Sequence, residues 1–523
     1  MTLTVDQVVK REASAWTDKT SWESVLRDAF EFALPMRNQY EQKQKGAPKM
    51  DRVFDSTAIN STQRFGARMQ AGLTPPFQDW ADLEPGPLVP KEIEAEVRGK
   101  LQAIKAQLFA AIHISNFASA SAEYFLDLAS GTAAMLVMEG DDDIPIMFNC
   151  IPNVQLAIDE GPFGTVDGVF RRFKMKVRNI KRQWKDANLV DGLTISETDD
   201  DPEREVDLIE ATYYDLKTDA YVYQVIWKEG GDKKTGDAHD LVNRSFPDHP
   251  WIITRWVKAP GEIWGRGPLL IALPDIKTLN KVKELILKNA SLAIAGVWAA
   301  ADDGVINTST IKITPGAVIP VAAQGNLQPL QFGGRFDVAQ LVVEDLQNSI
   351  RTMLFDRGLP SETGGVRSAT EIIERVKELQ QDIGAPFGRM MAEMVRPLIQ
   401  RCLSILHKKG VLEQEVKVNG LGVAVTVTSP LARLQSLNDL EAVVQWLQIS
   451  GGLVGPQGVG VGAIVEDVTG WVGQKLGVPQ ELIRTEEEKS ALQKMAGQAA
   501  AAGAQIPVGQ PANDGGGAIP LAA

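Results

Sequence analysis

The sequence predicts a mixed α+β protein that is predominantly helical. Three observations predict this class. Apolar residues recur with helical spacing from residue 20 to residue 129, the middle third holds short segments rich in β-branched and aromatic residues, and long amphipathic stretches return after residue 269. With 523 residues, of which 44% are hydrophobic and 23% charged, the chain is long enough for several compact units.

Helical spacing predicts four helices in the first third. The first ends at Pro35, and the second begins where Asp55 and Ser56 offer side chains that cap a helix. A Pro-Pro pair stops the second helix, because proline cannot continue a helix. The four predicted helices span residues 20–34, 55–73, 91–113 and 117–129.

The period changes in the middle of the chain, between residues 136 and 257. Phe173, Met175 and Val177 alternate with charged residues, as in a strand with one buried face. Three further segments are rich in β-branched and aromatic residues and are separated by turn-like sequence. The predicted strands span residues 173–177, 206–214, 221–227 and 251–257.

Long amphipathic helices are predicted in the second half. The first covers residues 269–295, would span roughly 30–40 Å at about 1.5 Å per residue, and contains Pro274 as a kink or as its true start. A second covers 336–355, and a third runs from a capping box at Ser368 to 409 with a break near 384–386. The remaining expectations are short strand-like runs at 311–313 and 317–321, a strand at 423–428, helices at 431–449 and 480–501, and a disordered tail.

Charge and cysteine content restrict the class of protein. A net charge of −13 argues against a conventional binder of free duplex DNA, but it suits a protein that encloses DNA and lets it slide. Cys150 and Cys402 are the only cysteines, which indicates a reducing compartment. Neither a signal peptide nor a membrane-spanning stretch is expected, so assembly in the cytoplasm is predicted.

Motifs for catalysis, cofactors and metals are not found. No GxxxxGK motif followed by Ser or Thr occurs, and the glycine pattern at 458–463 lacks the βαβ context of a dinucleotide site. The four histidines form no zinc motif. The acidic runs 141–143 and 199–201 flank turn-like sequence, so solvated loops are favoured over metal sites. We therefore expect no enzyme, no cofactor and no metal.

One basic stripe stands out on the helix predicted at 269–295. Lys277, Lys281 and Lys288 are spaced by four and seven residues, which places them on one helical face. That face is either an ordinary solvated surface or the lining of a channel that meets phosphates. The apolar stripes of the same helices are either core or a seam between subunits, and the sequence leaves both alternatives open.

Eight segments resemble the head-to-tail connector, or portal, proteins of podoviruses. Their order and spacing agree over about residues 20–440, whereas the Gly-rich region 451–462 and the tail are not covered. The segments are WESVLRDAFEFALP (22–35), VFDSTA (53–58), AGLTPPFQDW (71–80), GTAAM (131–135), PWIITRWVKAPGEIWGRGP (250–268), ALPDIKTLN (272–280), ATEIIERVKE (369–378) and SPLARLQ (429–435).

The resemblance implies a portal fold with a wing, stem helices, a clip and a crown. By analogy, each part corresponds to a range of this sequence. The ranges are 1–268 for the wing, 269–295 for the first stem helix, 296–335 for the clip, 336–356 for the second stem helix, 357–367 for a tunnel loop, 368–429 for a wing helix and strand, 430–495 for the crown and 496–523 for a disordered tail.

The resemblance also implies a function in DNA packaging and genome ejection. The chain would form a dodecameric ring at one capsid vertex, through which duplex DNA passes, and would meet terminase, tail adaptor proteins, and scaffold and major capsid proteins in the virion. We expect Lys277, Lys281, Lys288, Arg357 and Arg367 to line the channel, with glycines of the tunnel loop letting it shift. The alternatives are another adaptor or scaffold protein of the virion and, less favoured, a metal-dependent nuclease.

Overall fold

The computed structural model describes residues 3–40, 46–190, 193, 203–228, 238–295, 298–300, 327–329, 336–356, 384, 386–428 and 443–450, with single positions at 452, 468 and 472. The chain divides into two compact units, residues 1–431 and 432–523. In the second unit, residues 443–450 are helical. All sheets and the other helices described below belong to the first unit.

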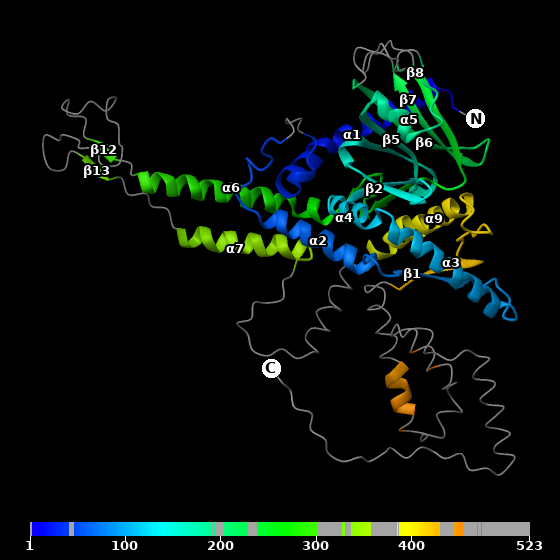
Figure 1. Ribbon diagram of the computed structural model, residues 1–523. Coiled ribbons are helices and arrows are strands. Elements are labelled where there is room, and N and C mark those ends of the chain that lie inside the picture. Colours follow the sequence, from blue (N-terminus) through cyan, green and yellow to red (C-terminus); the bar gives the residue numbers. More distant parts are fainter. Residues whose placement is uncertain are drawn as a thin grey trace, which may run out of the picture. The chain divides into compact units, whose positions relative to one another are not determined.

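Helix α1 (Val5–Ala33) is longer than the sequence pattern predicted. It begins with a capping box, in which the Gln7 backbone N–H donates to Thr4 and the Thr4 backbone N–H donates to the Gln7 side chain. The prediction started at residue 20 because two of the buried positions in the first half of α1 hold the charged residues Glu12 and Lys19. Val8 and Ala15 are nevertheless buried, since this half packs against a sheet (Figure 1).

Three further helices form where spacing predicted them: α2 (Thr57–Leu73), α3 (Glu94–Ile114) and α4 (Phe117–Leu128). A short 3-10 turn, Pro35–Arg37, follows α1. Asp55, not Ser56, caps α2, because its carboxylate accepts from the Thr57 backbone N–H at 2.8 Å. Trp80 fills the core beside them, edge-on to Phe109 at 5.3 Å between ring centres.

The largest sheet has five antiparallel strands in chain order. They are β4 (Leu156–Glu160), β5 (Val166–Lys176), β6 (Glu205–Asp215), β7 (Ala220–Lys228) and β8 (Ala238–Phe246). The predicted strand at 173–177 is the end of β5, and Val177 instead starts the short helix α5 (Val177–Gln183). Figure 1 shows the N-terminal half of α1 beside this sheet.

A second, three-stranded sheet connects the helices to the rest of the unit. Strand β2 (Thr132–Glu139) lies between β3 (Ile146–Ile151) and β9 (Trp251–Arg255). The sequence did not predict β2, because its buried residues are consecutive and show no alternation. It did not predict β3 either, although the burial of β3 alternates from Ile146 to Cys150. The predicted strand 251–257 is interrupted at Trp256, after which β10 (Val257–Lys258) pairs with β11 (Gly265–Arg266).

Strand β1 (Ala81–Pro85) pairs with β14 (Val423–Val427), so residues far apart in sequence close one side of the helical core. Before β14, a π-helical turn (Met391–Val395) leads into α9 (Arg396–Lys408). The predicted break at 384–386 includes residue 385, which lies outside the described residues. The helix start at Ser368, the helix at 480–501 and the tail lie outside the described residues.

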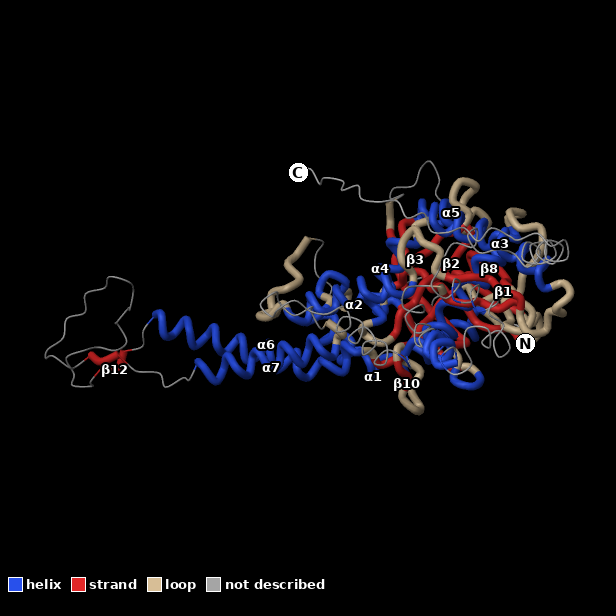
Figure 2. The backbone as a smooth tube through the Cα atoms, turned by 90° about the horizontal axis from the view of Figure 1, so that it is seen from below, coloured by secondary structure: helices blue, strands red, loops and turns tan. Residues whose placement is uncertain are grey.

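Two long helices, α6 (Pro268–Ala295) and α7 (Phe336–Met353), lie side by side in both views (Figure 2). Beyond them, β12 (Trp298–Ala300) pairs with β13 (Leu327–Pro329), while the strand-like runs at 311–313 and 317–321 lie outside the described residues. The predicted fold class, mixed α+β, is confirmed. Among the described helices, none is both long and apolar enough to cross a bilayer.

Candidate functional site

The candidate site is the hairpin of α6 and α7, and its base is fixed by a close crossing of glycines. A Cβ on Gly267 would lie 2.1 Å from the Ala129 carbonyl oxygen, and one on Gly265 would lie 2.1 Å from the Gly131 oxygen. Gly131 itself has a φ of +120°, which side chains rarely adopt. Leu269 N–H donates to the Ala129 oxygen at 3.0 Å, so the first turn of α6 is bound to the end of α4.

A second fixture is the segment 52–57, which holds both helices of the hairpin. Asn280 of α6 accepts from the Phe54 backbone N–H at 2.7 Å and donates to the Arg52 carbonyl at 2.8 Å. Asp55 accepts from Gln347 of α7 at 2.8 Å. Because Asn280 is almost fully buried, these bonds fix the position of this segment against α6.

The pKa of the Asp55 carboxyl is shifted by its surroundings. Burial alone would raise the pKa of its carboxyl, but hydrogen bonds from Thr57 and Gln347, with Lys283 at 4.0 Å, lower the pKa below its usual value. The carboxyl is therefore ionised at neutral pH, and it contacts Thr57 of α2, Lys283 of α6 and Gln347 of α7. Since Asp55 and Asn280 both belong to segments that carry the resemblance, those segments meet at the hairpin base.

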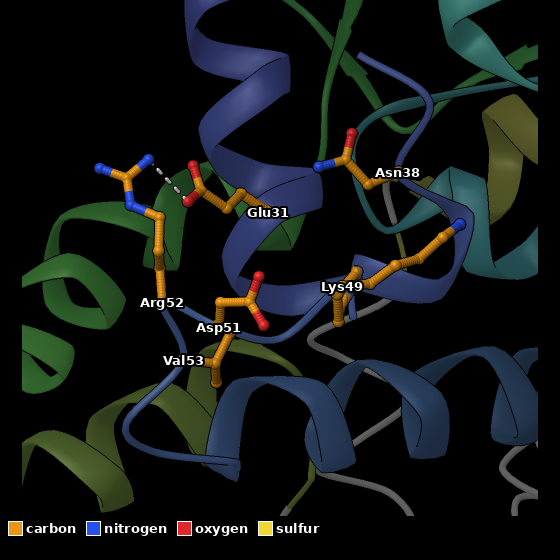
Figure 3. A pocket seen from close by; sticks show the side chains of 7 residues that line it. Glu31, Asn38, Lys49, Asp51, Arg52 and Val53 are labelled. Carbon is orange, nitrogen blue, oxygen red and sulfur yellow. Dashed lines mark ion pairs between the residues drawn. The ribbon is translucent and has the colours of Figure 1, made fainter. Parts of the chain in front are cut away.

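A small pocket lies between the end of α1 and residues 49–53 (Figure 3). Acidic and basic side chains both line it, and Glu31 is already paired with Arg52 at 2.9 Å. The Arg52 backbone is the one that accepts from Asn280. The pocket therefore lies beside the segment that holds α6. Because its lining carries both acidic and basic side chains, it is not arranged for one charged ligand.

The end of α7 is held from the other side by α2. Asp356, only 2% exposed, accepts from Ser61 at 2.9 Å and from Arg64 at 3.2 Å. Arg68 lies 3.5 Å from the same carboxylate and also donates to the Phe355 carbonyl. The chain therefore leaves α7 at a fixed point, immediately before the loop predicted at 357–367.

The predicted lysines share one exposed face of α6, and each already has a carboxylate partner. Lys277 pairs with Asp28 of α1 at 2.6 Å, while Lys281 and Lys288 both pair with Glu284, at 2.9 and 2.5 Å. Hydrogen bonds from Lys288 and Lys281 lower the pKa of Glu284 to about 2. Arg357 and Arg367, the other two predicted channel residues, lie outside the described residues.

The outer half of the hairpin exposes large apolar side chains. Leu285 and Leu287 of α6 are about half exposed, and Leu341 of α7 is 68% exposed. Elsewhere on α6, from Leu269 to Leu279, the apolar side chains are mostly buried. Large apolar side chains are thus left uncovered on both helices of the outer hairpin.

Other side chains of types that can act in catalysis are held in structural contacts. Arg37 donates to both oxygens of the fully buried Asp127, at 2.8 and 2.6 Å, next to Cys150. Burial raises the pKa of Asp127 and of the Cys150 thiol. Of the acidic runs, Asp141 accepts from the Ile144 N–H in a turn, and 199–201 lies outside the described residues. In the described ranges, His, Cys, Asp and Glu form no metal-binding group.

Sequence reasoning found the lysine stripe but missed the residues that position the hairpin. Asp55 was recognised as a capping residue and not as a ligand of Gln347, and Asn280 and Asp356 were not singled out. A polar Asn within the apolar stripe of a predicted helix is a signal that could have indicated Asn280. Asp356 offered no such signal, because its partners lie almost three hundred residues away.

The sequence of this chain matches the model of a family described as bacteriophage head to tail connecting protein, over residues 5–483. The chain belongs to this family. The resemblance read from its segments is thus confirmed. The chain is 23% identical to the portal protein of Salmonella phage epsilon15, over 95% of this chain and 93% of that protein. It is also 23% identical to the probable portal protein of Bordetella phage BPP-1, over 80% of this chain and 78% of that protein.

Solved structures show only weak likeness to this fold. A chain from the virion of a native gene transfer agent particle matches with a TM-score of 0.33 and 11% identity, covering 75% of this chain and 86% of that one. A chain from the neck of such a particle has a TM-score of 0.33 and 10% identity, covering 76% and 86%. The family assignment therefore depends on the sequence match.

Proposed function

We propose that this chain is one subunit of a portal, a ring of twelve copies that surrounds a channel for duplex DNA at one capsid vertex. The family match over residues 5–483 carries this proposal, together with portal relatives aligned over most of their length. DNA would enter during packaging and leave during ejection. The ring would be assembled in the host cytoplasm and remain in the virion.

The parts of the chain are proposed as follows. The α6–α7 hairpin is the stem, residues 296–335 beyond it are the clip, and 357–367 is the tunnel loop. Residues 1–268 and 368–429 form the wing, 430–495 form the crown, and 496–523 form a disordered tail. Terminase and later the tail adaptor proteins would dock at the clip, and scaffold and major capsid proteins around the wing.

The fixed base of the hairpin supports this assignment. Three contacts hold the two helices in one direction, as a channel wall requires. They are the close approach of Gly267 to Ala129, the hydrogen bonds of Asn280 to residues 52 and 54, and the hydrogen bonds that Asp356 accepts from α2. For the bore, we propose Arg357 and Arg367 at either end of the tunnel loop. We also propose that Lys277, Lys281 and Lys288, which share one exposed face of α6, line the channel.

Imaging the purified full-length chain by electron microscopy tests the proposed function. We expect rings with a central hole, because portal subunits would associate through exposed surfaces such as the outer hairpin. A particle that stays monomeric would instead indicate an adaptor or scaffold protein. Degradation of duplex DNA in Mg²⁺, lost on changing Asp141, Asp142 and Asp143 together, would indicate a nuclease.

A further inference from the structure

Two turns of the five-stranded sheet lie at the same edge of that sheet. The turn 161–165 joins β4 to β5, and the turn 216–219 joins β6 to β7. Val169 of β5 pairs with Thr212 of β6, so the start of β5 lies level with the end of β6. Since neighbouring strands lie about 4.8 Å apart, the two turns are about 10 Å apart.

Each of these turns presents one large apolar side chain to solvent. Phe163 is fully exposed, and Leu216 is 83% exposed. Single exposed apolar residues are common on protein surfaces and need no explanation. In the part of the chain that the structure describes, however, no large apolar side chain is more exposed than these two. The two greatest exposures thus occur together, on turns that lie close to one another.

The backbone of Phe163 has an unfavourable conformation. Its φ is +56°, in the left-handed region that glycine adopts easily and that a bulky residue rarely adopts. Such strain persists where the surrounding structure enforces it, and it occurs preferentially at functional sites. The ring gives nothing to the fold in return, because it is fully exposed. For folding alone, glycine would suit this position better than phenylalanine does.

Cations from a neighbouring segment hold the first turn in place. Arg255, which is buried, donates to the Gly164 carbonyl at 3.0 Å. Lys258 pairs with Glu160, next to the turn. A backbone hydrogen bond of 2.8 Å closes the turn itself. Phe163 is therefore presented from a turn whose position is fixed by the fold.

The second turn is held by the buried carboxylate of Asp215. One of its oxygens accepts from the Lys217 backbone N–H at 3.1 Å, and the other accepts from the Thr218 hydroxyl at 3.3 Å. A bond from aspartate to the backbone two residues later is a common way to hold a turn. The positive φ of Asp219 is ordinary turn geometry, which aspartate tolerates. Leu216 thus also projects from a turn of defined shape.

The surroundings of the two turns are acidic. Besides the ion pair of Arg255 with Glu393, the described residues place five carboxylates but only three cations in the turns and at the strand ends beside them. Phosphates of nucleic acid or of anionic lipid would be repelled here, whereas a basic protein surface would be attracted. The carboxylates are those of Asp159, Glu160, Asp167, Asp215 and Asp219, and the cations are Arg11, Lys217 and Lys258.

We propose that these two turns dock another protein of the particle, one that offers an apolar socket to Phe163 and Leu216 and a basic rim to the carboxylates around them. This inference rests on the proposed function, because it assumes assembly into a particle with other proteins. A protein suits the turns better than a membrane does, since apolar segments that enter a bilayer surface are usually accompanied by cations. Burial in the assembled particle explains why a strained and exposed phenylalanine stands here.

Assembly of particles tests this docking. The full-length chain is co-expressed with the scaffold and major capsid proteins of its phage, and its copies in purified particles are counted by quantitative mass spectrometry. Phe163→Asp with Leu216→Asp should lower incorporation by more than about tenfold, because charges replace the apolar contacts. Rings of the isolated double variant should form as they do in the unchanged chain. Normal incorporation of the double variant would overturn the proposal.

Leu88→Asp with Leu421→Asp is the matched control. These leucines are 70% and 53% exposed, and they lie close together but outside the five-stranded sheet. The control should be incorporated normally, and an equal loss would overturn the assignment to the two turns. If the unchanged chain forms no rings, the proposed function fails. If rings form and the Phe163 and Leu216 variant is still incorporated, only the docking fails.

A second measurement separates docking from a role in folding. Phe163→Gly removes both the ring and the backbone strain. The isolated variant should therefore unfold at an equal or higher urea concentration, while its incorporation into particles falls. A lower urea midpoint would show that the ring stabilises the fold, and this would overturn the reason given for its exposure.

Photochemical cross-linking identifies the docked molecule. Benzoylphenylalanine in place of Phe163 should, on irradiation of assembled particles, join the chain to a different particle protein. The linked peptide should contain lysine or arginine beside apolar residues, and high salt during assembly should lower the yield. Products formed only between copies of this chain, or only with DNA or lipid, would exclude the proposed docking.

Discussion

Replacing Gly267 by alanine should loosen the base of the hairpin. Its Cβ would lie 2.1 Å from the Ala129 carbonyl oxygen and 2.5 Å from the Gly131 nitrogen, and both of these are backbone atoms. A backbone atom cannot rotate away as the end of a flexible side chain can. The start of α6 must therefore move by roughly 1 Å, since ordinary carbon–oxygen contacts lie above about 3 Å.

The expected cost follows from what this movement breaks. Leu269 N–H donates to the same Ala129 oxygen, and losing a hydrogen bond of this kind costs about 0.5–1.5 kcal/mol. Forcing an extra carbon into a packed site costs about 1–3 kcal/mol. The reduced entropy of the unfolded chain with alanine offsets about 0.4–1 kcal/mol. Gly267→Ala should thus lower the free energy of unfolding by about 2 kcal/mol, within a range of about 0.5–4 kcal/mol.

Urea unfolding followed by tryptophan fluorescence measures the change, at one protein concentration so that assembly contributes equally. Gly99→Ala is the matched control, because Gly99 lies within α3 and a Cβ there meets no atom within 4 Å. It should leave stability unchanged or raise it by up to about 1 kcal/mol. If Gly267→Ala unfolded within about 0.5 kcal/mol of the unchanged chain, the close crossing would not hold α6 in place.

Three further outcomes follow from the same contacts. Asn280→Ala should cost about 1–3 kcal/mol in urea unfolding, because the Phe54 and Arg52 backbone groups lose their partner, whereas exposed Thr278→Ala should change little; equal effects would contradict the clamp. Asp55→Asn should destabilise at pH 7, and since the folded pKa of Asp55 is lowered, the difference from the unchanged chain should shrink as pH falls below about 4; a difference constant down to pH 2 would refute this. Arg37→Ala should cost about 3–5 kcal/mol by leaving the Asp127 carboxylate buried and unpaired, and adding Asp127→Ala should recover part of the loss; additive losses would contradict the pairing.

Local sequence determined the helices but not their full extent. Helical spacing placed α2, α3, α4, α6 and α7 within a few residues, because an apolar face repeats every three to four residues whatever its partner. It cut α1 short, since the buried residues of its first half include Glu12 and Lys19, whose burial depends on partners elsewhere in the chain. Lys19, for example, donates to the Asn153 carbonyl at 2.6 Å.

The sheets were harder to predict than the helices. Strands β5, β6, β7 and β9 were indicated by their own composition. Strand β2 is buried on both faces and therefore has no alternation to reveal it. Strand β1 owes its existence to β14, a partner more than three hundred residues away, and no local pattern encodes such a pairing.

By itself, the sequence determined the family, the fold class and the presence of two long amphipathic helices, with lysines on one face of the first. These properties are local, or lie in the order of short segments, so they can be read along the chain. Tertiary structure decided which groups those segments bring together: Gly131 with Gly265, Asp55 with Gln347, and Ser61 with Asp356. It also decided which residues of α6 and α7 stay exposed, because burial depends on neighbours that only folding brings into contact.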